Sequence, residues 1–268
     1  MKLLLPILFS LFVLNAHSQE SPSTAEKPFA PLEGTFALKI VTTGKIDLPL
    51  VGEKTPKGHI LFLLTRKWNN EKGYYSRKAR ICSGTSGSMF GISTKVSQRG
   101  YRSIPPSYSK LMVDEKHETL TIKNELFLWG LKNLPKPLTA KLPQSLEEAQ
   151  SPAFRDIVYD VDKDGHPGIT IKAEGMIDGE LHAVQRRVTH FNGKAFSPDR
   201  QAGRVNVLRE SVILESTTYL IGEGPRTPMQ HPDPKRSWFE AIRINNNDSC
   251  DTVLKMNRQN AFSKTSPL

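Results

Sequence analysis

The chain has 268 residues, with 37 Lys and Arg against 27 Asp and Glu and a formal net charge of +10 at pH 7. Its length is sufficient for one large domain with a full core. After the first twenty residues no segment is apolar for long enough to cross a bilayer as a helix, which excludes a helical membrane protein.

The chain opens MKLLLPILFSLFVLNAHSQE, with basic Lys2, an apolar stretch and small residues Ala16 and Ser18 before a cleavage point. This pattern predicts a signal peptide over residues 1–18 and a periplasmic or secreted protein. Cleavage would leave 36 basic against 27 acidic side chains, a charge of +9. Export makes nucleic acid an unsuitable partner and favours envelope polyanions, acidic glycans or lipid head groups.

Residues 19–32 are polar and Pro-rich, which indicates a flexible lead-in. From residue 33 the chain shows the period-two alternation of strands with one buried face, as in Phe36, Leu38 and Ile40. Residues 59–65 are apolar on both faces and predict a central strand. One further strand is expected to place Leu120, Ile122, Asn124, Leu126 and Leu128 on one face. Other strands are expected at 72–82, 86–96, 108–114, 169–174, 204–220 and 238–245.

Hairpin turns are predicted at Asp178-Gly179 and at Asn192-Gly193, where both turn residues tolerate positive φ. The Pro-rich segment 131–155 is a long connection inside the domain or a boundary between two domains, and Ser145 with Glu148 could cap a short helical turn within it. The domain would end at residue 255, followed by a mobile tail over 256–268. The count of short strands predicts an all-β fold with very little helix, either a closed or partly open antiparallel barrel or a two-sheet sandwich. The polar C-terminus and the Pro-rich connection argue against a membrane-spanning barrel.

Cys82 and Cys250 are the two cysteines of the chain. In an exported protein they are expected to form a disulfide, although two free thiols remain an alternative.

The segment DVDKDGHPG contains Asp160, Asp162 and Asp164 at alternate positions before Gly165. Three carboxylates in this spacing can converge on a calcium ion, with the backbone carbonyl of His166 as a further ligand. The loop does not match a helix-loop-helix calcium hand, because Ile171 occupies the position of the bidentate Glu. An ion-free turn, in which the Asp side chains accept backbone N–H groups, is the alternative.

Basic and aromatic side chains also alternate closely between residues 66 and 80. On neighbouring strands they could form a cationic face with stacking rings for a polyanion, or an ordinary solvated strand edge. The candidate residues are Arg66, Lys67, Trp68, Lys72, Tyr74, Tyr75, Arg77, Lys78 and Arg80.

Two further patterns carry little functional signal. His182 and His190 share one strand face with valines, which is typical of packing residues. Glu210 and Glu215 fall on opposite faces of their strand and form no carboxylate pair. No catalytic residue is assigned.

The segments GTFAL, DLPLVGEKTPKGHILFLL, IPPSY, DVDKDGHPGITI and AVQRR, together with Cys82 and Cys250, resemble uncharacterised secreted bacterial proteins that share a D-x-D-x-D-G-x-P-G loop. The resemblance implies export and one β domain, and no activity. We therefore expect an exported, non-enzymatic β module that binds an envelope component or a small ligand, with calcium as a candidate stabilising ion. A metal-assisted hydrolase using the loop from Asp160 to His166, and a lipocalin-like small-ligand carrier, remain alternatives.

Overall fold

The computed structural model describes residues 32–48, 52–88, 91–114, 116, 118–218 and 221–268. The predicted signal peptide and nearly all of the predicted lead-in lie outside these residues. Eight described strands form a closed antiparallel ring, because β9 pairs with both β7 and β10. In spatial order the ring contains β10 (Arg200–Ser216), β13 (Trp238–Ile244), β1 (Gly34–Leu48), β3 (Lys57–Asn69), β4 (Tyr74–Thr85), β6 (Ser107–Asp114), β7 (Thr119–Trp129) and β9 (Gly179–Ser197). The barrel predicted from the strand pattern is confirmed.

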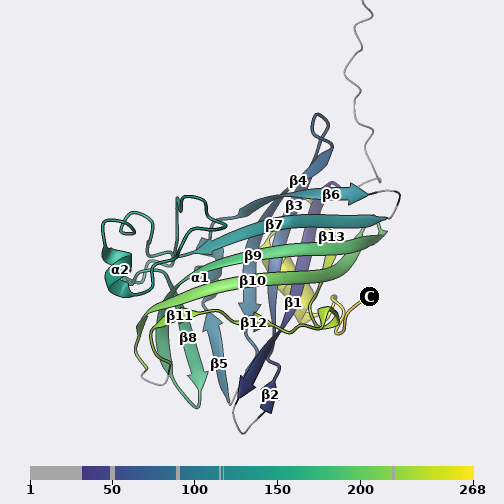
Figure 1. The fold of residues 1–268 in the computed structure, drawn as a ribbon. Helices are drawn as coiled ribbons and strands as arrows, with labels where there is room; N and C mark the ends of the chain where they lie inside the picture. Colours follow the sequence, from purple (N-terminus) through teal and green to yellow (C-terminus); the bar gives the residue numbers. More distant parts are fainter. Residues whose placement is uncertain (1–31, 49–51, 89–90, 115, 117, 219–220) are drawn as a thin grey trace, which may run out of the picture.

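Shorter elements extend the ring at one end. There the sheet splits into two arms, one formed by β9, β8 and β5 and the other by β1 and β2 (Figure 1). The remaining elements are β2 (Gly52–Lys54), β5 (Ile92–Val96), β8 (Ile169–Gly175), β11 (Gly224–Arg226), β12 (Met229–Gln230), α1 (Gln98–Ser103), α2 (Leu146–Gln150), the 3-10 turn η1 (Pro234–Arg236) and α3 (Cys250–Arg258).

One seam of the barrel is completed by a side chain. β10 pairs with β13 only as far as Arg204. Beyond this point Gln230 of β12, which pairs with β1, accepts the N–H of Val207 at 2.7 Å and donates to the carbonyl of Val205 at 3.0 Å. The side-chain amide of Gln230 thereby forms the hydrogen bonds to β10 that a paired strand would otherwise form. It does so where the two arms begin to separate.

The inward faces of the ring carry the main core. Phe36, Leu38 and Ile40 of β1 are buried there, as their alternation predicts. Phe62 and Phe127 meet with ring centroids 5.5 Å apart. Leu32, expected to belong to the flexible lead-in, is completely buried in the same cluster. The ordered domain therefore starts just before the predicted boundary.

The face predicted for residues 120–128 is wrong beyond Ile122. The pairing of β7 with β9 shifts between Ile122 and Glu125, and Asn124 adopts a φ of +56°. This bulge adds a residue, so the side chains after it change faces. Glu125, Phe127 and Trp129 point inward, whereas Leu126 and Leu128, predicted to be on the same face as Leu120, are only partly buried.

The first predicted hairpin is present, but its turn differs from the expected one. β8 and β9 pair from Ala173 and Gly179. The residue with positive φ is Gly175 (+120°), where a Cβ atom would come 1.9 Å from the carbonyl oxygen of Gly91. Asp178 accepts the N–H of Gly175 at 3.3 Å.

The second predicted hairpin, at Asn192-Gly193, does not exist. Gly193 lies inside β9, opposite Gly203 of β10. A Cβ atom on Gly193 would come 2.7 Å from the ring of Phe239, so this glycine allows close packing rather than a turn.

The Pro-rich connection packs on the outer faces of β9 and β10. Leu131, Leu142 and Val158 form a second buried cluster with Val184 and Leu214 of those strands. Within the connection, the Oγ atom of Ser145 accepts the N–H of Glu148 at 3.1 Å and begins α2, which confirms the predicted cap. The connection thus belongs to the same domain as the barrel.

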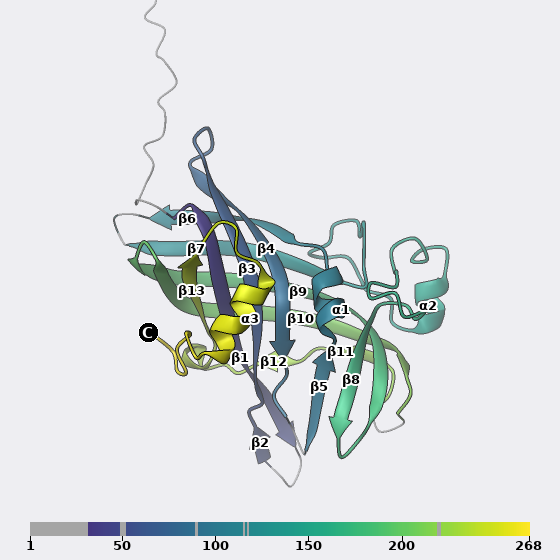
Figure 2. The same cartoon turned by 180° about the vertical axis from the view of Figure 1, so that it is seen from behind.

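Helix α3 covers the outer faces of β1, β3 and β4 (Figure 2). The helix extends beyond residue 255 to Arg258, and the predicted mobile tail packs on the barrel. Phe262 is buried, and Ser263 donates its N–H to buried Glu240 at 2.7 Å. The prediction of a mobile tail was wrong because the one buried aromatic residue of this polar segment, Phe262, gives no periodic signal in the sequence.

Candidate functional site

The residues predicted to form one cationic face divide between the inside and the outside of the barrel. Arg66, Tyr75 and Arg77 are buried in the interior. Trp68 and Tyr74 are partly buried. Lys67, Lys72, Lys78 and Arg80 are exposed. The alternation that identifies β3 and β4 as strands also places these side chains on opposite faces of the sheet. The sequence therefore contains the signal that separates the buried from the exposed basic residues.

The interior arginines are held by polar partners and aromatic rings. Arg77 forms an ion pair with Glu125, and Arg66 donates to Gln201. The guanidinium of Arg66 lies 4.5 Å from the ring of Phe36. Burial, reinforced by repulsion from Arg243, lowers the pKa of Arg66 to about 9. These two arginines therefore belong to the core and do not form an external surface.

The exposed cations continue onto the next strand of the ring. Lys78 lies opposite Tyr108 of β6, with its Nζ atom 6.0 Å from the Tyr108 ring. Lys110 lies 4.9 Å from the ring of Tyr74. Tyr108 itself is 71% exposed. We call the exposed outer surface formed by Lys67, Lys78, Arg80, Tyr108 and Lys110 the cationic face.

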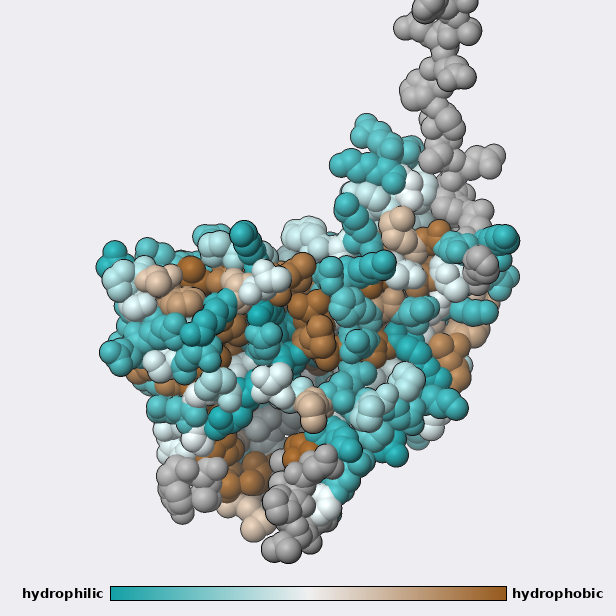
Figure 3. Space-filling model, in the orientation of Figure 1, coloured by the Kyte–Doolittle hydropathy of each residue, from teal (hydrophilic) through white to brown (hydrophobic). Residues whose placement is uncertain are grey.

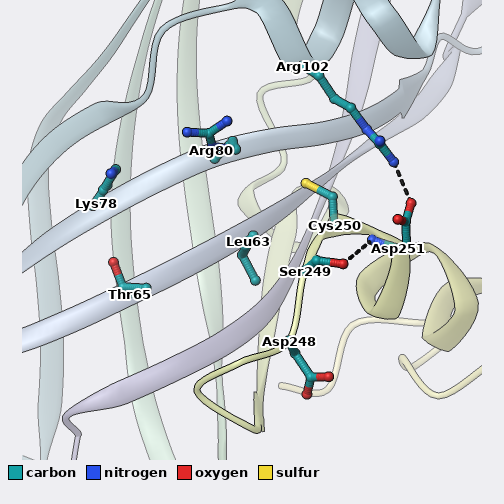
Figure 4. A pocket seen from close by; sticks show the side chains of 9 residues that line it. All are labelled: Leu63, Thr65, Lys78, Arg80, Arg102, Asp248, Ser249, Cys250 and Asp251. Atoms are coloured by element: carbon teal, nitrogen blue, oxygen red, sulfur yellow. Dashed lines mark hydrogen bonds and ion pairs between the residues drawn. The ribbon is translucent and has the colours of Figure 1, made fainter.

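A pocket of about 440 Å³ lies beside the cationic face, where β3 and β4 meet α1 and the start of α3 (Figure 4). Lys78 and Arg80 extend into it from β4, and Arg102 reaches it from α1. Among the described residues neither Lys78 nor Arg80 takes part in an ion pair, whereas Arg102 pairs with Asp251. The remaining lining residues are Leu63, Thr65, Asp248, Ser249, Cys250 and Asp251.

The start of α3 is attached to the wall of this pocket by the disulfide between Cys82 and Cys250, whose Cα atoms are 5.2 Å apart. The predicted disulfide is thus confirmed. Cys82 lies in β4 two residues after Arg80, and Cys250 is the first residue of α3. Ser249 caps the helix by accepting the N–H of Asp251 at 3.2 Å. The positive end of the helix dipole lies at the pocket, where the carboxylate of Asp251 in the first turn partly offsets it.

The acidic loop, residues 160–168, connects the Pro-rich segment to β8. Its two ends meet, since Val161 donates to the carbonyl of Gly168 at 2.9 Å and Gly168 donates to the carbonyl of Tyr159 at 3.1 Å. Gly168 has a φ of +95°, and a Cβ atom there would come 2.4 Å from the carbonyl oxygen of Ala183. The glycine lets the closed loop lie directly against β9.

Asp160 organises the turn of this loop. Its carboxylate accepts the backbone N–H groups of Lys163, Asp164 and Gly165 at 2.6, 3.2 and 2.8 Å. Lys163 and Gly165 both have positive φ. These bonds are those expected of the ion-free turn. The Oδ1 atom accepts two of them, whereas the Oδ2 atom accepts one and retains a lone pair for a cation.

Asp162 is the buried member of the acidic group. Its Oδ2 atom accepts the N–H of Thr170 at 3.1 Å, while its Oδ1 atom is buried without a hydrogen-bond partner among the described residues. Burial raises the pKa of Asp162, and the charges of Asp164 and Asp160 raise it further. Ligand atoms of the three aspartates lie within 4.8 Å of one another, a spacing that a calcium ion could bridge.

Asp164 links the loop to His182, whose position in the sequence pattern predicts only a packing role. Its carboxylate accepts the hydroxyl proton of Thr170, and the Thr170 oxygen lies 2.9 Å from Nδ1 of His182. Partial burial alone would raise the pKa of Asp164, but the bonds from Thr170 and from the N–H of His166 lower it.

His166 projects from the loop over the strands below. Its Nδ1 atom lies 3.0 Å from Oε2 of Glu215, and its ring stacks on the ring of His182 with centroids 3.9 Å apart. The hydrogen bond with Glu215 raises the pKa of His166. His182 is 2% exposed, as its packing pattern predicts, but its contact with His166 and Glu215 was not foreseen. Glu215 lies opposite His182 because the register of β10 with β9 shifts between Ile213 and Glu215.

Comparison with known proteins gives little further information. No protein-family model matches the chain, and no curated protein matches it. Among solved structures, the crystal structure of Neisserial surface protein A (NspA) aligns with a TM-score of 0.38 and 8% sequence identity, over 79% of this chain and 98% of that chain. This similarity is too low to support a functional argument, so the barrel fold rests on the strand pairings described above.

Proposed function

We propose that this protein is an exported, non-enzymatic β-barrel module that binds an anionic envelope component, such as a phosphorylated or sulfated glycan, in the pocket beside the cationic face. One observation carries the proposal: Lys78, Arg80 and Arg102 line a cavity of about 440 Å³ together with the N-terminus of α3, and they outnumber its two acidic lining residues, Asp248 and Asp251. Basic side chains and a helix N-terminus both favour negatively charged groups.

The outer surface supports recognition in water rather than insertion into lipid. Lys110, Lys123 and Lys194 point outward from β6, β7 and β9 and are exposed. A lysine on the lipid-facing side of a barrel costs about 2–4 kcal/mol at the membrane midplane and about 0–1 kcal/mol near the interfaces, so each of these lysines opposes insertion to a degree set by its depth. The wall formed by β7, β9 and β10 carries hydrophilic residues interspersed with small hydrophobic areas (Figure 3). Within the described residues no helix has the length and apolar character needed to cross a membrane.

Export is supported by the disulfide and by the apolar segment at the start of the sequence, which lies outside the described residues. Structural disulfides persist in oxidising compartments. The lipocalin-like alternative places a ligand inside the barrel, where Phe36, Phe62, Tyr75 and Phe127 are fully or almost fully buried against one another and against the interior arginines. The pocket on the outside is therefore the stronger candidate.

Calcium at the acidic loop is the second part of the proposal, with a structural role. The Oδ1 atom of Asp162, which is buried and has no hydrogen-bond partner in the part of the chain that the structure describes, supports it, as does the close approach of the Asp160 and Asp164 carboxylates. An ion would offset the repulsion among three neighbouring negative charges.

The anion site is tested with polyphosphate and heparin as probes, by titration calorimetry at low ionic strength. We expect Lys78→Gln combined with Arg80→Gln to weaken binding at least tenfold, and salt to weaken binding to the wild type. Lys194→Gln, an exposed lysine on β9, is the matched control and should change affinity little. Absence of binding by the wild type, or equal losses in the control and pocket variants, would reject the pocket as the site.

A further inference from the structure

We propose that His166, His182 and Glu215 form a binding site for a divalent transition-metal ion of the zinc type. One nitrogen of each imidazole and one carboxylate oxygen lie within 4.8 Å of one another. Two imidazoles and a carboxylate are a donor set that suits zinc, copper or nickel, whereas calcium prefers oxygen ligands alone. None of the three residues lines the anion pocket, so this site does not depend on the proposed anion binding.

The hydrogen bonds of Thr170 determine which nitrogen of His182 is available. The single hydroxyl proton of Thr170 is donated to Asp164, so the Thr170 oxygen must accept a proton from Nδ1 of His182. His182 then carries its proton on Nδ1 and a lone pair on Nε2. This order of carboxylate, hydroxyl and imidazole resembles the outer hydrogen bonds that orient histidine ligands in metal sites.

The free nitrogen of His182 is the second, independent observation. The side chain is 2% exposed, and its Nε2 atom is buried without a hydrogen-bond partner among the described residues. A buried acceptor without a partner is unfavourable in a folded protein and calls for an explanation. A metal ion held jointly with His166 and Glu215 would supply the missing partner.

The other two ligands are placed differently. Glu215 lies directly across from His182 in the pairing of β9 with β10, so these two side chains form a rigid part of the site. His166 is exposed and comes from the acidic loop. Ligands of one tetrahedral zinc ion lie only about 3.3 Å apart, given Zn–N bonds of about 2.0 Å. The three donor atoms lie within 4.8 Å of one another, so they must approach one another to hold one zinc ion. The exposed His166 ring can rotate from its stacked position to allow this approach.

The surrounding charge favours a cation. The carboxylate of Asp164, bonded to Thr170 beside His182, adds negative charge next to that of Glu215, whereas Glu180 is paired with Lys172 at 3.0 Å. A metal ion would take the place of the proton that His166 and Glu215 share at 3.0 Å. Zinc binding should therefore release protons and weaken at low pH.

The test uses the full chain after dialysis against a chelator. Titration calorimetry with zinc should give one ion per chain, and cobalt in place of zinc should give visible absorption bands of a low-coordinate site. His166→Gln and Glu215→Gln should each weaken zinc binding at least tenfold. Both positions are at least partly exposed, so the variants are expected to fold, which thermal melting of the metal-free proteins checks.

His190→Gln, on the same strand as His182, is the matched control and should bind zinc like the wild type. Asp162→Asn separates this site from the calcium loop. The proposal is overturned if the wild type binds no zinc, if His166→Gln and Glu215→Gln bind it normally, or if only Asp162→Asn loses it.

Discussion

The guanidinium of Arg77 pairs with the carboxylate of Glu125 inside the barrel, and the two side chains are 1% and 0% exposed. The pair exists because the bulge at Asn124 turns Glu125 inward, toward β4. Both charges have lost their hydration, so each depends on the other.

Removing one partner of this pair should therefore be costly. We expect Glu125→Gln to lower the free energy of unfolding by about 3–5 kcal/mol, because the charge of Arg77 would stay buried without compensation. Denaturant unfolding measures the change. Glu180→Gln is the control, since Glu180 pairs with Lys172 at 3.0 Å where both side chains are exposed, and it should cost about 1 kcal/mol or less. Equal effects of the two substitutions would contradict the role given to burial.

The disulfide should contribute strongly to stability. It joins residues 168 positions apart, for which the chain-entropy model gives about 5 kcal/mol, and measured values are often smaller. We expect the double variant Cys82→Ala, Cys250→Ala to melt at a lower temperature and to bind polyphosphate more weakly, because the start of α3 is no longer attached to β4. Unchanged binding together with a lower melting temperature would show that the helix N-terminus does not contribute to the anion site.

The Pro-rich connection should be releasable without loss of the barrel. Leu142 is 3% exposed in the cluster that attaches the connection to β9 and β10, so Leu142→Ala should cost about 2–5 kcal/mol locally. Limited proteolysis should then cut within residues 131–155 while the β-sheet circular dichroism signal persists. Leu138, which is 44% exposed, supplies the control variant Leu138→Ala. Resistance of Leu142→Ala to cleavage would show that the rest of the cluster and Arg186, which donates to the carbonyls of Pro137 and Ala140, hold the segment without Leu142.

The barrel should lose stability on mild acidification through His59. Burial lowers the pKa of this histidine from its ordinary value of 6.5, and repulsion from Lys39 lowers it further. The unfolded chain then binds the proton more tightly than the folded one, so this contribution is present above pH 6.5 and is lost as pH falls through the folded-state pKa. Melting temperatures from pH 8 to pH 5 should fall less in His59→Gln than in the wild type. If the melting temperatures of the two proteins fall equally with pH, His59 does not cause the loss of stability.

Calcium binding by the acidic loop has its own test. If the carboxylates of Asp160, Asp162 and Asp164 share an ion, calcium added to chelator-treated protein should raise the melting temperature. Asp162→Asn should abolish this rise, whereas Asp156→Asn, an exposed acid outside the loop, should preserve it. A wild-type melting temperature that does not respond to calcium would leave the hydrogen-bonded turn of Asp160 as the complete description of the loop.

Several features of the fold could be predicted because they depend on local chemistry. The alternation of Phe36, Leu38 and Ile40 predicts a strand with one buried face. Ser145 and Glu148 predict a helix start that the structure confirms. The pairing of Cys82 with Cys250 follows from their being the two cysteines of the chain.

Other features depended on residues distant in sequence. The period-two pattern defines two faces of a strand, but a bulge exchanges them, and the bulge at Asn124 is stabilised by pairing with β9. The zinc-type site combines His166, His182 and Glu215 from a loop and two strands, and an irregularity in β10 determines that Glu215 faces His182.

The sequence by itself therefore indicated most of the strands, the all-β class and the expected disulfide. Hydrophobic alternation is a local signal, and a pairing of two cysteines can be expected whatever their separation in the chain. Only the tertiary structure decided which charges are buried, as with Arg77, and which are exposed around the pocket, as with Arg80. The physical reason is that closing the ring fixes the register between strands far apart in the chain, and register decides which side chains meet.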